Sequence, residues 1–331
     1  PPGGGLPPAR LSLASGARLI AGAAVGCGSE TGPYPSSEIK LIVQAAPGGL
    51  SDTVSRIMGS LIEHDLGVPV VCQNKPGASG ALAFSYVTRR PPDGYTIGHG
   101  PVEIAMVRGL GYADVGPEDM SLICMVSRVA PVLVVQEEAP WATFEEFVAA
   151  GRERPGELIM ANSGVGSIWH FNTLLLEQHT GMRATHLPYG GSTPGLVALL
   201  GGHVDAVIAG VSEVVSHVRS GRLRALAVFD GERAAVLPET ATTYEFGYEM
   251  GAAAWSGFYG PSGLPDTVRA RLEEAFAAAF ETEEWTTLCR EQGLQPLFLD
   301  REEFEAFAGE QARFFGAQIP ELVRLAGAGG S

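Results

Sequence analysis

From Ile39 onward, apolar residues alternate between short continuous runs and helical spacing. The run Ile39–Ala46 predicts a strand, and Val54, Ile57, Met58, Leu61 and Ile62 then recur at i, i+3, i+4, i+7 and i+8, which predicts a helix with one apolar face. Further short runs predict strands at 69–74, 95–100, 131–136, 157–163, 184–189, 205–210 and 224–229. Strands that alternate with helices indicate an α/β fold with largely parallel sheets.

Helix starts are marked by side chains that can cap a helix. Thr143 with Glu146, and Asp300 with Glu303, have the spacing of capping boxes. The segment 266–281 places Val268, Leu272, Phe276 and Phe280 on one face, which predicts another amphipathic helix.

Three predicted strand-to-helix loops are rich in Gly, Ser or Thr: 46–52, 161–170 and 187–195. In open α/β sheets, ligands bind outside the carboxyl ends of strands, where such loops lie. Each loop offers backbone N–H groups beside the positive end of a helix dipole, which favours an anion. The same loops are also compatible with plain turns and helix caps, and the pattern does not choose between phosphate and carboxylate.

Composition narrows the classes of function. The chain has 331 residues and a formal net charge of −15. No cluster of Lys and Arg interleaves with aromatic residues, so we expect no nucleic-acid partner. CxxC, HExxH and paired-histidine motifs are absent, so we expect no metal site, and we expect no cofactor.

The N-terminus has the pattern of an export signal. Arg18 precedes the short apolar stretch LIAGAAVG and then Cys27. We interpret 1–26 as an export signal of lipoprotein type, AVGC as a lipobox with Cys27 as the lipidation site, and 27–37 as a linker. Ala24 stands where a lipobox usually has leucine, and the alternative is an irregular N-terminus with an incidental cysteine.

Motifs that span 34–315 resemble the Bug family of extracytoplasmic solute receptors, the TctC-like binding proteins of tripartite tricarboxylate transporters. They run in order as APGG-x-x-D, N-x-PGA-x-G, DGYT, RPGELIMANSGVGSIWH, HLPYGGSTPGLVALLGGHVDAVIAG, SGRLRALAV and WSGFYGPSGLPDTVRARL. Lys75 stands where the family more often has arginine, and Ala241 where it has proline.

The resemblance implies a two-lobed type II periplasmic-binding-protein fold, each lobe a mostly parallel sheet flanked by helices, with the ligand cleft between the lobes. By analogy, lobe 1 comprises 34–130 plus 230–331, and lobe 2 comprises 131–229. The implied ligand is a small carboxylate: a di- or tricarboxylate, an acidic amino acid or an aromatic acid. The implied partners are the membrane permease subunits of the transporter. We expect an exported monomer that lies in the periplasm or on the outer face of the cell membrane. We expect it to be attached to the membrane only through a lipid anchor at Cys27.

The resemblance also implies the ligand-binding residues. They lie in or next to the three loops: Gly48, Gly49, Ser163, Gly164, Gly166, Ser167, His170, Tyr189, Ser192, Thr193 and Asp205. His170 is equally compatible with an ordinary position in a helix. Asp205 is compatible with a structural hydrogen bond at the start of a strand, or with contact to the ammonium group of an amino-acid ligand. Trp169, Trp255 and Phe258 are compatible with the core, and one of them lining the cleft would suit an aromatic acid.

Two other functions stay open. A carboxylate-sensing receptor that feeds a signalling protein would have the same sequence pattern. An α/β enzyme acting on a small carboxylate is disfavoured, because G-x-S-x-G is absent and APGGLSD does not supply G-x-G-x-x-G. We therefore expect no catalytic residues.

Overall fold

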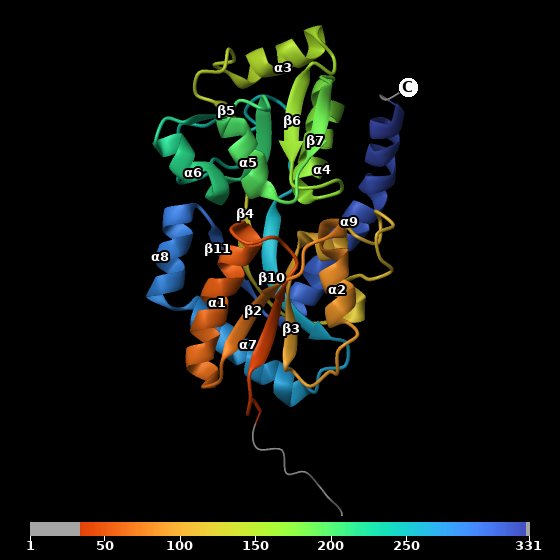
Figure 1. Ribbon diagram of the computed structural model, residues 1–331, viewed down its shortest axis with the longest axis vertical. Helices are drawn as coiled ribbons and strands as arrows, with labels where there is room; N and C mark the ends of the chain where they lie inside the picture. Colours follow the sequence, from red (N-terminus) through yellow and green to blue (C-terminus); the bar gives the residue numbers. More distant parts are fainter. Residues whose placement is uncertain (1–33, 329–331) are drawn as a thin grey trace, which may run out of the picture. The chain divides into compact units, whose positions relative to one another are not determined.

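The computed structural model describes residues 34–328, except for the side chains of 321–328. The predicted export signal and Cys27 lie outside the described residues. Within the described range, the strands form two separate sheets, one of six strands and one of five (Figure 1).

The six-stranded sheet has the order β11-β4-β10-β3-β1-β2. Its strands are β1 (Ile39–Val43), β2 (Val70–Asn74), β3 (Thr96–Pro101), β4 (Met120–Val129), β10 (Ala254–Pro261) and β11 (Gln295–Leu299). The pattern of apolar runs predicts β1, β2 and β3 but not β4, β10 and β11, which complete this sheet.

The five-stranded sheet has the order β7-β6-β8-β5-β9. Its strands are β5 (Pro131–Gln136), β6 (Leu158–Asn162), β7 (Ala184–Pro188), β8 (Ala206–Gly210) and β9 (Leu223–Val228). All five coincide with predicted apolar runs.

The predicted α/β fold is confirmed, and the expectation that its sheets are mostly parallel needs a correction. In the larger sheet, β1 pairs in parallel with β2 and β3, whereas β10 pairs antiparallel with β3 and β4, and β11 antiparallel with β4. In the smaller sheet, β6 pairs in parallel with β7 and β8, and β5 pairs antiparallel with β8 and β9. Both sheets are therefore mixed.

Helices cover the sheets (Figure 1). With the six-stranded sheet lie α1 (Leu50–Leu66), α2 (Ala81–Val87), α7 (Asp266–Phe280), α8 (Glu283–Gln292) and α9 (Arg301–Ala328), and with the five-stranded sheet lie α3 (Phe144–Glu153), α4 (Ile168–Thr180), α5 (Ser192–Leu200) and α6 (Val211–Arg219). The predicted capping box of Asp300 and Glu303 forms: Asp300 Oδ1 accepts the Glu303 N–H at 3.0 Å, and the Glu303 carboxylate accepts the Asp300 N–H at 3.2 Å. Thr143 caps α3 by accepting the Glu146 N–H at 3.2 Å, but the Glu146 carboxylate accepts the Ala142 N–H and not that of Thr143, so this box is incomplete.

The chain passes from the larger sheet to the smaller one between β4 and β5, which are separated only by Ala130. It returns through 229–253, which connects β9 to β10. We therefore keep 34–130 with 230–331, and 131–229, as the proposed boundaries of the two lobes. Helix α9 also packs against α4 of the smaller sheet, where Phe315 lies edge-on to Phe171 with ring centroids 5.1 Å apart.

Among residues 34–328, no helix combines the length and the apolar character that crossing a membrane requires. Cys72, Cys124 and Cys289 are free thiols.

Candidate functional site

A cavity of about 390 Å³ is lined by residues that follow strands of both sheets. From the larger sheet's side, the residues that line the cavity are 44–47, 49–51, 76–80, Pro101, Glu103 and 254–256. The smaller sheet's side contributes Ser163, Gly164, 167–169, 189–194 and Glu213. All three predicted loops therefore reach one cavity, and each lobe supplies part of its wall.

The first loop connects β1 to α1 and is held by Asp52. The Asp52 carboxylate accepts the Gly48 N–H at 3.0 Å and an Asn74 amide N–H at 2.8 Å, and it pairs with Arg56. Although burial opposes it, hydrogen bonds from Arg56, Asn74 and Gly48 hold the pKa of Asp52 below its usual value. Gly48 adopts φ +89°, a left-handed conformation that favours glycine. Asp52 thus shapes the loop from behind and does not line the cavity.

The second loop connects β6 to α4. Asn162 Oδ1 accepts the Gly164 N–H at 3.0 Å, and Gly164 has φ +120°, which a residue with a side chain rarely adopts. Ser167 is the N-cap of α4, because its Oγ accepts the His170 N–H at 3.3 Å. Ser163, Gly164 and Ser167 all line the cavity.

The third loop connects β7 to α5 and is tied to the second, because the Tyr189 N–H donates to the Asn162 carbonyl at 2.9 Å. Tyr189, Ser192 and Thr193 line the cavity. Among residues 34–328, no acceptor is paired with the N–H groups of 190–193. These four N–H groups remain free for a ligand at the N-terminus of α5.

Three hydrogen bonds to backbone carbonyls join the two lobes across the cavity's rim. Ser79 Oγ and Tyr112 Oη both donate to the Val165 carbonyl, at 2.9 and 3.1 Å, and Thr193 Oγ1 donates to the Gly48 carbonyl at 3.2 Å. These contacts exist only when the lobes lie close together. The structure is therefore a closed arrangement of the two lobes.

Two predicted glycines do not line the cavity. A Cβ on Gly166 would lie 2.8 Å from Leu110 Cδ1, so this glycine permits the close approach of the lobes. The Gly48 N–H and carbonyl are used by Asp52 and Thr193, as described above. Gly49, next to it, does line the cavity.

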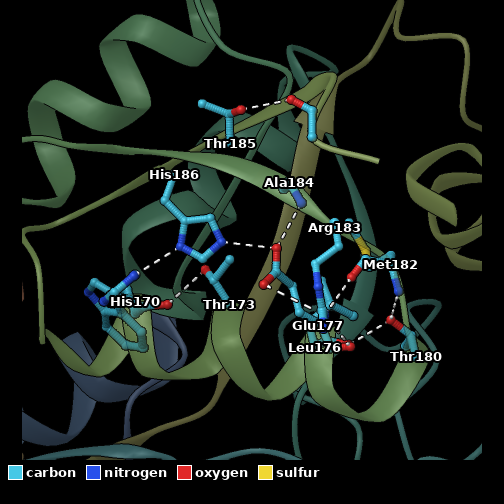
Figure 2. Close-up of polar contacts among 12 residues, drawn as sticks. His170, Thr173, Leu176, Glu177, Thr180, Met182, Arg183, Ala184, Thr185 and His186 are labelled. Atoms are coloured by element: carbon cyan, nitrogen blue, oxygen red, sulfur yellow. Dashed lines mark hydrogen bonds and ion pairs between the residues drawn. The ribbon is translucent and has the colours of Figure 1, made fainter. Parts of the chain in front are cut away.

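The structure corrects the prediction that His170 binds the ligand. Its ring belongs to a chain of polar groups on the flank of α4 (Figure 2). The Gly166 N–H donates to His170 Nδ1 at 3.1 Å, His170 Nε2 lies 2.9 Å from His186 Nδ1, and His186 Nε2 lies 3.0 Å from Glu177 Oε1. Because Nδ1 of His170 accepts, the neutral ring carries its proton on Nε2 and donates to His186, which in turn donates to Glu177. His170 thus positions the second loop through Gly166 and does not line the cavity.

Burial, followed by the neighbouring His186, lowers the pKa of His170 to about 4. The ring is therefore neutral in neutral solution, as its role as an acceptor for the Gly166 N–H requires.

The structure also corrects the prediction that Asp205 binds the ligand. It immediately precedes β8, at the amino end of the sheet, whereas the cavity lies beyond the carboxyl ends of the strands. Its Oδ2 accepts the Ile159 N–H at 2.8 Å, and its own N–H donates to the Ile159 carbonyl at 2.9 Å. Asp205 therefore joins β6 to the start of β8.

Sequence reasoning misses two acidic residues of the cavity wall, Glu103 and Glu213. Both follow the carboxyl end of a strand within a few residues, β3 and β8 respectively, so the strand-end rule that selected the three loops also points to them. Neither has a glycine-rich loop around it. Trp169 and Trp255, for which the sequence leaves two roles open, also line the cavity.

Residues 54–323 match the family model described as the tripartite tricarboxylate transporter family receptor, TctC. The chain belongs to the TctC family. Protein BugT of Bordetella pertussis is 30% identical over 308 residues, which cover 92% of this chain and 94% of BugT.

Solved structures agree with this family and with the fold. The periplasmic binding protein BugD superposes with a TM-score of 0.81 at 25% identity, covering 87% of this chain and 98% of BugD. The R. palustris protein Rpa4515, solved with adipate, superposes with a TM-score of 0.81 at 28% identity, covering 89% of this chain and 98% of Rpa4515. This TctC-family chain therefore has the two-lobed periplasmic-binding-protein fold, and its family and fold are those of solute-binding receptors.

Proposed function

We propose that this TctC-family receptor captures a small carboxylate in the cavity between its lobes and delivers it to the membrane permease subunits of a tripartite tricarboxylate transporter. The observation that carries the proposal is the cavity of about 390 Å³, walled by strand-to-helix loops of both lobes. A cavity of this size suits a small metabolite.

The donors of the site support a carboxylate. The free N–H groups of 190–193 lie at the start of α5, where the helix dipole adds a favourable field. Hydrogen bonds from N–H groups to a charged carboxylate are shorter and stronger than those between neutral groups. The structure of Rpa4515 with adipate, a dicarboxylate, supports the same ligand chemistry in a relative.

Transport is favoured over enzymatic turnover by the histidine network. A hydrolytic Ser-His-acid arrangement needs a histidine nitrogen that faces a hydroxyl nucleophile. At the end of the Glu177–His186–His170 chain, His170 Nδ1 instead accepts the backbone N–H of Gly166. Sensing for a signalling protein would use the same binding site as transport.

Export to the periplasm or the outer cell surface completes the proposal, with a lipid anchor at Cys27 and a monomeric receptor. For the anchor, we expect an acyl mass on the N-terminal peptide and release of a Cys27→Ser variant from the membrane fraction. Continued membrane association of that variant would remove the anchor from the proposal.

A thermal-shift screen of small carboxylates, with neutral analogues of equal size beside them, tests the function. We expect a carboxylate to raise the melting temperature because it binds the folded state alone. The compound should be recovered unchanged after incubation. A chemically altered compound would favour an enzyme, and a screen without any stabilising carboxylate would contradict the proposal.

A further inference from the structure

Each lobe extends a glutamate to the start of a helix in the other lobe. Glu103, in the short helix η2 (Val102–Ala105) after β3, accepts the N–H of Ile168, the first residue of α4, at 3.2 Å. Glu213, in the first turn of α6, accepts the Gly210 N–H at 3.0 Å, and its Oε1 lies 3.8 Å from a Cβ placed on Gly49, the N-cap of α1. The exchange between the lobes is reciprocal.

These contacts change the expected use of the three helix starts. The starts of α1 and α4, which the sequence offers to a ligand anion, already have carboxyl groups of the protein beside them: Glu103 accepts the Ile168 N–H of α4, and Glu213 lies next to Gly49 at α1. Among the described residues, the N–H groups of 49–51 at the start of α1 have no hydrogen-bond acceptor either, but Glu213 Oε1 lies beside them, 3.8 Å from a Cβ placed on Gly49. The start of α5 offers a run of free N–H groups at 190–193. A ligand carboxylate is therefore expected at α5.

The described cavity wall carries two carboxyl groups and no basic side chain. Among the described residues that line the cavity, Glu103 and Glu213 are acidic and none is Lys, Arg or His. Burial raises the pKa of both carboxyls, and the charge of Glu213 raises that of Glu103 further. A second ligand carboxylate near them would meet two further carboxyl groups in a poorly solvated place, whereas a cation would stabilise their ionised form, which burial alone disfavours.

The aromatic residues of the wall are a separate observation that favours a cation. The residues Trp169, Trp255 and Tyr189 line the same cavity. Trp169 lies near Glu213, because an atom of each side chain is 3.4 Å from the position that a Cβ on Gly210 would take. Electron-rich ring faces attract cationic nitrogen, and tryptophan does so most strongly.

We infer that the cavity selects a small zwitterion, whose carboxylate binds the N-terminus of α5 and whose cationic nitrogen binds Glu103 and Glu213. The inference rests on the proposed function and specifies its substrate class. The two glutamates make dicarboxylates and tricarboxylates without a cationic nitrogen weaker ligands than such zwitterions.

Matched ligand pairs test the inference by isothermal titration calorimetry at about pH 7.5. In each pair, an ammonium group replaces one carboxylate of a chain of similar length: 4-aminobutyrate against succinate, and 6-aminohexanoate against adipate. We expect at least one amino compound to bind about tenfold or more tighter than its partner. A dicarboxylate that binds as tightly as its amino partner, or more tightly, overturns the inference and leaves the proposed function intact. Absence of binding by all four compounds counts against both.

Isosteric variants locate the selectivity. Glu213→Gln and Glu103→Gln keep an oxygen that can accept the Gly210 or Ile168 N–H and remove the charge. We expect each to reduce the ratio of amino-compound to dicarboxylate affinity by about tenfold. Glu145→Gln, at an exposed position on α3, is the matched control and should keep the wild-type ratio. An unchanged ratio in both cavity variants overturns the inference. The wild-type pairs decide the question alone if either variant fails to fold.

Discussion

Thr193 Oγ1 donates a hydrogen bond to the Gly48 carbonyl at 3.2 Å, and so joins the third loop of one lobe to the first loop of the other. Gly48 is in turn fixed by Asp52, which accepts its N–H. The closed arrangement of the lobes is therefore stabilised at the same loops that form the ligand cavity. Ligand binding and lobe closure should be coupled, because a ligand that contacts both lobes stabilises only the closed state.

Replacement of Thr193 by valine tests this coupling. Thr193→Val removes the hydroxyl and keeps the side-chain shape, so we expect ligand affinity to fall by roughly 0.5–1.5 kcal/mol. The radius of gyration without ligand, measured by small-angle scattering, should increase. Thr286→Val, on the exposed surface of α8, is the control. A Thr193→Val protein with unchanged affinity and radius would show that this contact does not contribute to closure.

Ser167 combines a structural and a ligand-facing position. Ser167→Ala removes the N-cap of α4 and should lower the free energy of unfolding by roughly 0.5–2 kcal/mol in urea titrations. Thr282→Ala removes the equivalent cap of α8, away from the cavity, and should cost a similar amount. Only Ser167→Ala should also weaken ligand binding. Equal ligand affinity in the two variants would remove the Ser167 hydroxyl from the binding site.

The His170 network should make stability depend on pH. The pKa of His170 is about 4 in the folded protein against an ordinary value of 6.5, so between these values the unfolded chain binds a proton that the folded protein does not. The free energy of unfolding should therefore fall as pH is lowered from about 6.5 towards about 4, by at most roughly 3 kcal/mol from this residue.

The variant His170→Gln isolates this effect, because glutamine can still accept the Gly166 N–H and does not titrate. Urea unfolding at several pH values should show a shallower loss of stability on acidification than in the wild type. His64→Gln, at an exposed position near the end of α1, controls for the loss of one histidine. The same pH dependence in wild type and His170→Gln would contradict the assigned neutral state.

Much of the fold could be predicted from local sequence patterns. The apolar runs at 39–46 and 131–136 mark strands because neither is interrupted by charge except at Lys40, and the glycine-rich loops mark strand ends. Strands β4 and β10 escape this approach because polar residues and glycines interrupt their apolar runs, such as Ser127 and Arg128 in β4 and Ser256 and Gly257 in β10. Strand β11 begins with Gln295 and Pro296, which also hide its strand character.

The site could be predicted only where a loop sequence dictates its own geometry. Gly49, Ser163 and Ser192 lie in loops whose glycines and serines mark strand-to-helix turns. His170 follows such a loop, but the face of α4 on which its ring lies depends on packing against β7. Glu103 and Glu213 reach the cavity because the two lobes close on each other, which local sequence does not show.

Calorimetric titration of wild type and Gly49→Asp, with the carboxylate that gives the largest thermal shift, tests the central claim most directly. Gly49 has an ordinary extended backbone conformation, and a Cβ there lies 3.8 Å from Glu213 Oε1 without a clash, so the new carboxylate enters the cavity without strain. Gly316→Asp, which extends into open space on α9, is the matched control. If the ligand binds between the lobes, wild type and Gly316→Asp bind one molecule per chain with equal affinity, and Gly49→Asp does not bind. Undiminished binding by Gly49→Asp would place the ligand elsewhere and contradict a site between the lobes.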